Sequence, residues 1–314
     1  MVNVQESNVM QWAASSLCKG TKQGDPISPI IFNAVLEQVM RKVKEKRRSK
    51  RWGLQLGIGA DSIMTNLRFA DDILLVGRSL HQIKQMLADV REEGAKVGLE
   101  LHPGKTKIQH NNVGYGSQVR HARIGDMDIE VLDPTDTTMY LGRALSLTEV
   151  HDSELKHRIA KAWAKFGVYH GELTNKAIPL ELRLKLFHST VTPSILYGSV
   201  SWVMTSAREQ TLRTTQMKML RAILARKRLV TITVDSEKRI VESWVEWVKR
   251  VTTEARDAME IHGIPDWVHL QQDMICQWGG RVQQMEPHRW ARRVFDWEAE
   301  GWRSRGHPCM RALD

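Results

Sequence analysis

Short apolar runs separated by glycine, proline and charged residues fill the first half of the chain, and the most regular two flank a pair of adjacent aspartates. Residues 67–76 read LRFADDILLV. Two runs of β-favouring residues that meet at a polar pair predict two strands joined by a tight turn. We therefore expect Asp71 and Asp72 at the tip of a hairpin, in a fixed and partly desolvated position. The structural alternative is an Asp-Asp turn that only closes an ordinary hairpin.

Helical periodicity governs the segments on either side of this hairpin. Apolar residues recur at helical spacing from Ile30 to Val43, which predicts one helix, and a second helix is expected over residues 80–97. Residues 111–136 are polar and rich in glycine, which predicts a loop or a short hairpin. The order helix, hairpin, helix, strand predicts an α+β fold in which helices cover one face of an antiparallel sheet.

The pattern changes near residue 150, and helical spacing then dominates to the end, with an interruption expected at Pro193. We therefore expect three regions: 1–149 with mixed α and β structure, 150–230 with helices, and 231–314 with helices and many tryptophans. Nine of the eleven tryptophans lie beyond residue 150. Core packing is their usual role, and stacking on unpaired bases is the functional alternative.

Composition and charge narrow the function classes. The 314 residues are 42% apolar, which is enough for one substantial core or two modest ones. A net charge of +10 favours polyanions as partners, although a merely basic surface gives the same value. The sequence contains no apolar run of membrane-spanning length and no secretory signal pattern. Three scattered cysteines, Cys18, Cys276 and Cys309, argue against a disulfide framework. We expect an intracellular protein, nuclear or cytoplasmic, without a structural zinc ion.

Four segments carry a family resemblance by their order and separation. They are residues 20–33 with the run Gln23-Gly24-Asp25-Pro26-Ile27-Ser28-Pro29, the Phe69-Ala70-Asp71-Asp72 sequence, residues 98–107, and Tyr140-Leu141-Gly142. Together they resemble motifs B, C, D and E in the palm of a reverse transcriptase of the non-LTR retrotransposon (LINE) type. Residues 192–198 resemble the region that follows the palm in such proteins. A group II intron maturase or a viral RNA polymerase shares the palm chemistry, but the Phe69–Asp72 sequence and the long helical extension fit the LINE group better.

The resemblance implies a fold and a set of site residues. Residues 1–149 would be a partial palm, 150–230 a helical thumb, and 231–314 a helical C-terminal region. Asp71 and Asp72 would bind Mg²⁺ and act in catalysis, and Lys105 would lie near the phosphates of the incoming nucleotide. Residues that would contact the nucleotide or template are Gln23, Gly24, Pro26, Ser28 and Phe69.

Basic residues cluster in two places. The first is the end of the helix before the hairpin, from Arg41 to Arg51, and the second is the predicted thumb. A solvated helix face is the ordinary reading of such clusters. Beside a polymerase palm we expect phosphate contact, which adds salt-dependent affinity without sequence preference. The thumb residues with this expected role are Arg213, Lys218, Arg221, Arg226, Lys227 and Arg228.

One motif of the family is not found in this sequence. The first metal-binding Asp of such polymerases precedes motif B, whereas Met1 to Lys19 contain no Asp and only Glu6 as an acidic residue. We therefore expect the chain to be a fragment of an RNA-directed DNA polymerase that works with the upstream part of the same polyprotein. Its partners would be an RNA template, a DNA primer and a deoxynucleoside triphosphate. The alternative is a non-catalytic remnant that only binds nucleic acid.

Overall fold

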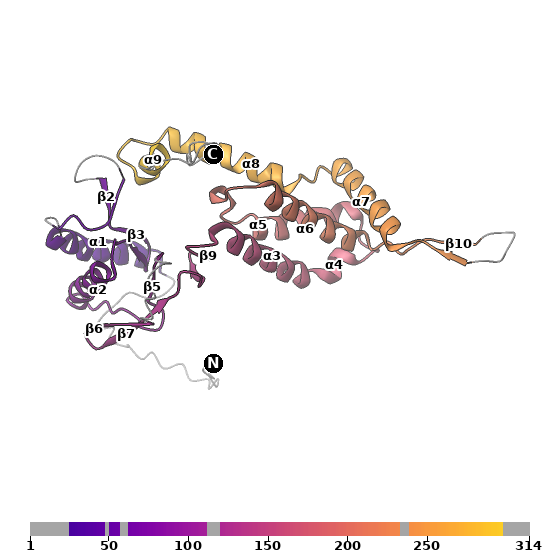
Figure 1. Ribbon diagram of the computed structural model, residues 1–314. Coiled ribbons are helices and arrows are strands. Elements are labelled where there is room, and N and C mark those ends of the chain that lie inside the picture. The colour runs from indigo at the N-terminus through magenta and orange to yellow at the C-terminus, as the bar shows by residue number, and fades with distance from the viewer. Residues whose placement is uncertain (1–24, 48–49, 57–61, 112–119, 233–238, 298–314) are drawn as a thin grey trace, which may run out of the picture. The chain divides into compact units, whose positions relative to one another are not determined.

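A computed structural model describes residues 25–47, 50–56, 62–111, 120–232 and 239–297 (Figure 1). The chain divides into two compact units. The first comprises Met1–Gln55, Ile63–Lys107 and His121–Glu130, and the second comprises Leu56–Ser62, Ile108–Arg120 and Val131–Asp314.

The first unit combines two helices with short antiparallel strands. Its elements are α1 (Ser28–Arg47), β1 (Leu54–Gln55), β2 (Ile63–Met64), β3 (Asn66–Phe69), β4 (Asp72–Leu75), α2 (Leu80–Ala95), β6 (His121–Ile124) and β7 (Met127–Leu132), of which β7 runs on into the second unit. β1 pairs with β2, β3 with β4, and β6 with β7, all antiparallel. β5 (Lys107–Gln109) lies beside β7 in the strand order β5-β7-β6. The mixed α+β class expected from the sequence is confirmed, as are the helices α1 and α2 and a short hairpin within residues 111–136.

The core of the first unit lies between α1 and α2. Four fully buried apolar side chains form it, and side chains from β4 and from the segment after α2 pack against them. The buried members are Leu36, Met40, Val43 and Val90. Ser79 begins α2 as an N-cap, because its hydroxyl accepts the N–H of Gln82 at 3.2 Å. The β3–β4 hairpin therefore packs against α1 and α2 through side chains of β4.

Charged residues at the end of α1 hold that helix to α2. Arg47 is buried, and its Nε donates to Asp89 at 2.8 Å while its Nη2 donates to the carbonyl of Met86 at 2.6 Å. The ammonium group of Lys46 lies 2.6 Å from the Glu93 carboxylate. Part of the basic run at 41–51 is therefore used in holding the two helices together, and Lys42 and Lys44 are among its exposed members.

The second unit is mainly helical. Its elements are β8 (Thr138–Tyr140), β9 (Arg143–Leu145), α3 (Val150–Val168), α4 (His170–Thr174), α5 (Leu180–Ile195), the 3₁₀ turn η2 (Ser199–Ser201), α6 (Ser206–Leu224), β10 (Val230–Ile232), β11 (Arg239–Val241), α7 (Trp244–Ile261), α8 (Trp267–Gln283) and α9 (Trp290–Asp296). A continuous apolar core runs through α3, α5, α6, α7 and α8. Trp267 is completely buried in it, stacked on Phe187, and its indole N–H donates to Thr192 at 2.9 Å. None of the described helices is long and apolar enough to cross a membrane.

Three local expectations for this unit need correction. Pro193 lies inside the last turn of α5, and the helix ends two residues later at Ile195, so the interruption follows the proline rather than occurring at it. Tyr140 ends β8, but Leu141 and Gly142 form the turn to β9 rather than a strand. Both have positive φ values, 48° and 73°, as a two-residue hairpin turn requires. The hairpin β10–β11 within the Trp-rich region was not expected from the helical pattern.

Candidate functional site

The β3–β4 hairpin has two different faces. Phe69 pairs with Asp72 and Arg68 with Ile73, so successive residues alternate between the faces. Ile73 and Leu75 pack against the helical core, and on the same face Arg68 reaches Glu37 of α1 at 2.8 Å. The carboxylate of Asp72 therefore shares the other face with Phe69, whose side chain is 67% exposed. Helix packing on one face thus leaves a carboxylate and an aromatic ring available on the other.

The turn of this hairpin consists of Ala70 and Asp71, whereas Asp72 is the first residue of β4, so the expected pair lies one residue further along the hairpin than the sequence predicted. Ala70 has φ 51°, in the left-handed region that residues with a side chain rarely adopt. The expectation of partial desolvation is wrong, because Asp71 and Asp72 are both exposed. Asp71 is exposed because the turn projects beyond the surface that the helices cover, and Asp72 is exposed because it lies on the face of β4 opposite Ile73 and Leu75. Within the described part of the chain, neither carboxylate has a hydrogen bond or an ion pair with another side chain.

These two carboxylates suit a hard divalent cation. Mg²⁺ prefers oxygen ligands and commonly uses one or two carboxylates together with substrate phosphates. Among the described residues, no group of three or more His, Cys, Asp or Glu side chains could hold a metal ion. Asp71 and Asp72 therefore fit as part of a magnesium site, whose remaining ligands have to come from phosphates or from another polypeptide segment.

The predicted nucleotide-contacting residues are placed only in part. Gln23 and Gly24 lie outside the described residues. Pro26 is exposed, and Ser28 begins α1 in a half-buried position. Asp25 stabilises the turn that precedes α1, because its Oδ1 accepts the N–H of Ile27 at 3.0 Å. Several apolar side chains at the start of α1 are exposed, namely Ile27, Ile30 and Ile31.

Lys105 lies in an exposed turn after α2. Its backbone N–H donates to the carbonyl of His102 at 3.1 Å, and the hydroxyl of Thr106 donates to the same carbonyl at 2.9 Å. The ammonium group is left exposed. In the described part of the chain no hydrogen bond or ion pair connects Lys105 with the Asp71–Asp72 turn.

The six basic residues of the predicted thumb fall into two groups. Three have partners within the second unit: Arg213 lies near Glu209 and Asp266, Arg226 pairs with Glu254 at 2.8 Å, and Arg221 donates to Thr252 at 3.0 Å. The other three are exposed, and among the described residues their side chains make no hydrogen bond or ion pair. They are Lys218, Lys227 and Arg228.

Sequence reasoning missed a cluster that holds the β8–β9 turn. Glu154 of α3 is completely buried, and its carboxylate accepts from the Ala144 N–H at 2.5 Å and from the Arg158 Nε at 2.8 Å. Arg158 also donates to the Gly142 carbonyl and lies over the ring of Tyr197, 4.8 Å from its centre. The i, i+4 spacing of Glu154 and Arg158 was visible in the sequence, but nothing there indicated that the pair is buried.

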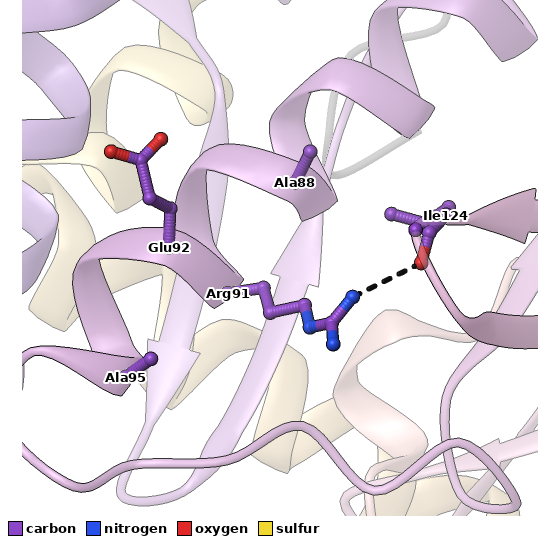
Figure 2. Close-up of a pocket in the computed structure, with 6 residues that line it drawn as sticks. Ala88, Arg91, Glu92, Ala95 and Ile124 are labelled. Atoms are coloured by element: carbon purple, nitrogen blue, oxygen red, sulfur yellow. Dashed lines mark hydrogen bonds between the residues drawn. The ribbon is translucent and has the colours of Figure 1, made fainter.

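A shallow hollow of about 310 Å³ is also present in the first unit, between α2 and the β6–β7 turn. Figure 2 shows Arg91 reaching across it from α2 to the carbonyl of Ile124, with a hydrogen bond of 3.3 Å. None of the residues predicted from the sequence lines this hollow. The candidate site is therefore the exposed hairpin tip rather than an enclosed pocket.

Comparison with known proteins gives the family context. Residues 4–145 match the family described as reverse transcriptase (RNA-dependent DNA polymerase). The chain is 28% identical over 252 residues to a putative uncharacterized transposon-derived protein of Caenorhabditis elegans, covering 80% of this chain and 83% of that protein. It is 28% identical over 186 residues to a retrovirus-related Pol polyprotein from the type-1 retrotransposable element R2 of Popillia japonica, covering 57% of this chain and 24% of the polyprotein. The corresponding type-2 polyprotein of Drosophila melanogaster is 28% identical over 130 residues, 40% of this chain and 11% of that protein. The chain thus spans a quarter or less of the length of these two R2 polyproteins.

Proposed function

This chain contains part of a reverse transcriptase domain of the non-LTR retrotransposon type, and on that premise we propose that the β3–β4 tip supplies catalytic carboxylates for DNA synthesis on an RNA template. The observation that carries the proposal is the adjacency of Asp71, in the turn, and Asp72, at the start of β4, at the tip of two paired strands within the region that matches the family. The hairpin is fixed by α1 and α2 on one face, so its tip is preorganised for a ligand that approaches from the other.

In this proposal each residue near the tip has a separate task. Asp71 and Asp72 hold Mg²⁺, which when bound neutralises phosphate charge and stabilises the charge that develops during nucleotidyl transfer. The ring of Phe69, on the same face as Asp72, offers a flat apolar surface to the nucleotide or primer end. Lys105 contacts the nucleotide phosphates with its exposed ammonium group. The loop residues Gln23, Gly24, Pro26 and Ser28 contact the nucleotide or the template.

The reaction is a phosphoryl transfer between substrates. The primer 3′-hydroxyl oxygen attacks the α-phosphate of the deoxynucleoside triphosphate, a new phosphodiester bond forms, and pyrophosphate leaves. The bond between the α- and β-phosphates breaks, and the proton of the hydroxyl passes to solvent water. The protein contributes chiefly by holding the reacting groups in line. The upstream part of the same polyprotein supplies the further carboxylate that such a site needs.

The helical unit binds the template–primer duplex in this proposal. We assign most of the phosphate contact to Lys218, Lys227 and Arg228, because their ammonium and guanidinium groups are exposed. Arg213 and Arg226 can also contribute, but phosphate has to compete there with protein carboxylates. Arg221 is half-buried, and burial lowers the pKa of its guanidinium group. An intracellular location, nuclear or cytoplasmic, belongs to the same proposal because the substrates are found there.

Primer extension by the complete polyprotein tests the proposal. The Asp71→Ala variant should lose template-directed extension while its affinity for the template–primer duplex stays close to that of the unmodified protein. Asp126→Ala is a matched control, because Asp126 is also an exposed carboxylate, at the separate β6–β7 turn. Extension that survives Asp71→Ala would refute the catalytic assignment.

A further inference from the structure

The base of the β10–β11 hairpin and the first turn of α7 expose a set of large apolar side chains. Trp244, the first residue of α7, is 60% exposed, and Val245 beside it is 55% exposed. Val230 and Val241 are cross-strand partners, so their side chains lie on the same face of the hairpin. The exposed side chains of this valine face and of the start of α7 are Val230, Val241, Trp244 and Val245, which we call the hairpin-base surface. An exposed apolar group of this size indicates a binding surface.

This surface is held rigidly by polar contacts beneath it. Arg250 donates two hydrogen bonds of 2.9 Å to the Glu242 carboxylate and one of 3.1 Å to the Lys227 carbonyl. Glu242 in turn accepts the N–H of Leu229 at 3.0 Å. The pKa of Glu242 is lowered to about 2, first by the hydrogen bond from Arg250 and then by the Leu229 N–H, so the carboxylate stays charged at neutral pH. The surface is therefore preorganised, which reduces the entropy lost when a ligand binds.

The same contacts bring a basic segment to the first two turns of α7. The indole N–H of Trp247, one turn after Trp244, donates to the Arg226 carbonyl at 3.0 Å. Residues 226–229 therefore run along the first two turns of α7, with the exposed side chains of Lys227 and Arg228 among them. Lys249 on α7 is also exposed. Exposed cations are therefore carried by the same two segments as the exposed Trp244 and the valines.

We propose that the hairpin-base surface binds an unpaired segment of nucleic acid. Trp244 would stack on a base, the valines would contact the next base or its sugar, and Lys227 and Arg228 would contact the flanking phosphates. Aromatic faces combined with cations are the usual means of holding single strands without sequence preference. Association of two copies through this surface is disfavoured, because it would bring two basic segments together. The inference rests on the proposed function, since it extends the phosphate contacts assigned above to Lys227 and Arg228 to an adjoining unpaired strand.

Binding of the full chain to two labelled probes tests this site by fluorescence anisotropy. The probes are a 12-nucleotide single-stranded RNA and a 12-base-pair RNA–DNA duplex. Loss of one stacked base predicts that Trp244→Ala weakens single-strand binding by about tenfold, while duplex affinity changes little. Trp163→Ala is the matched control, because Trp163 is also exposed but lies on α3. Trp244→Phe should recover most of the single-strand affinity, since it retains an aromatic face.

The contribution of Lys227 and Arg228 is tested separately, by the salt dependence of single-strand binding. In the Lys227→Gln/Arg228→Gln double variant, the plot of log binding constant against log salt concentration should become shallower for the single strand. The expected change in slope is roughly 1.4, the value for two lost phosphate contacts. Single-strand affinity that is unchanged in Trp244→Ala overturns this inference and leaves the polymerase assignment untouched. Primer extension that survives Asp71→Ala overturns the polymerase assignment without changing the single-strand result. Dimerisation that Trp244→Ala abolishes, without any effect on single-strand affinity, would identify the surface as a contact between copies.

Discussion

The hydroxyl of Tyr197 donates a hydrogen bond of 2.9 Å to the carbonyl oxygen of Leu141, which lies 56 residues earlier in the chain. The contact joins two segments that the family resemblance singled out separately, the Tyr140-Leu141-Gly142 sequence and residues 192–198. Arg158 completes the cluster, because it lies over the Tyr197 ring and also donates to the carbonyl of Gly142. The β8–β9 turn is therefore held from the helical part of the second unit.

Tyr197→Phe removes only the hydroxyl of this contact. We expect it to lower the free energy of unfolding by about 1 kcal/mol, the usual net value of one intramolecular hydrogen bond. Amide exchange at the β8–β9 turn should also become faster. Tyr169→Phe is a suitable control, because in the described part of the chain the Tyr169 hydroxyl has no hydrogen bond. Equal effects of the two substitutions in urea denaturation would contradict a specific role for the Tyr197–Leu141 contact.

Glu154→Gln tests the buried part of the same cluster. The substitution leaves the guanidinium of Arg158 without its carboxylate in a buried position, so we expect a loss of roughly 3 kcal/mol in the free energy of unfolding. Glu149→Gln provides the comparison, because Glu149 is exposed and lies 3.9 Å from Lys156, and surface pairs of this kind contribute about 1 kcal/mol at most. Similar urea midpoints for the two variants would show that the Glu154 charge is not needed.

Ala70→Gly addresses the strained backbone beside the aspartates. An alanine at φ 51° is in a left-handed conformation that costs about 1–2 kcal/mol per residue, whereas glycine adopts it freely. We expect the glycine variant to be about 1 kcal/mol more stable to thermal unfolding, because the relief of strain exceeds the added entropy of the unfolded chain. A destabilised variant would mean that Ala70 makes a compensating contact.

The decrease in the free energy of unfolding at acidic pH should depend on Glu93. Hydrogen bonds from Lys46 and then Lys96 lower the pKa of its carboxyl from 4.5 to about 2. The folded state therefore binds this proton less readily than the unfolded state, and the stability gained above pH 4.5 is lost as the pH falls towards 2. Glu93→Gln should be less stable than the unmodified protein at pH 7, and the difference should narrow on acidification. The exposed Glu45→Gln control should show no such narrowing, and a difference that stays constant with pH would contradict the assignment.

The sequence was informative where a short pattern determines local structure. Two runs of β-favouring residues that meet at Asp71 and Asp72 predicted the hairpin, and apolar residues at helical spacing predicted α1 and α2. It could not show that the aspartates are exposed, since exposure depends on how far the turn extends beyond the helices that cover the sheet. It also could not separate Lys218 and Arg228 from Arg226, whose partner Glu254 lies on another helix.

Long-range polar contacts account for most of what remained unpredicted. The hydrogen bond between Tyr197 and Leu141 and the buried Glu154 depend on the packing of α3 and α5 around the β8–β9 turn. The β10–β11 hairpin is only three residues long in each strand, and a pattern that short does not stand out against helical surroundings. Trp244 is exposed at the start of α7, and the sequence pattern did not distinguish it from the buried tryptophans.

Metal rescue in the complete polyprotein tests the central claim most directly. An Asp71→Cys variant replaces a hard carboxylate with a thiolate, which prefers softer cations than Mg²⁺. If Asp71 is a metal ligand, primer extension with Mg²⁺ should be lost in this variant and restored in part by Cd²⁺, whereas Asp71→Ala should respond to neither ion. Extension by Asp71→Cys that proceeds with Mg²⁺ at the unmodified rate would contradict the assignment of the β3–β4 tip as the catalytic centre.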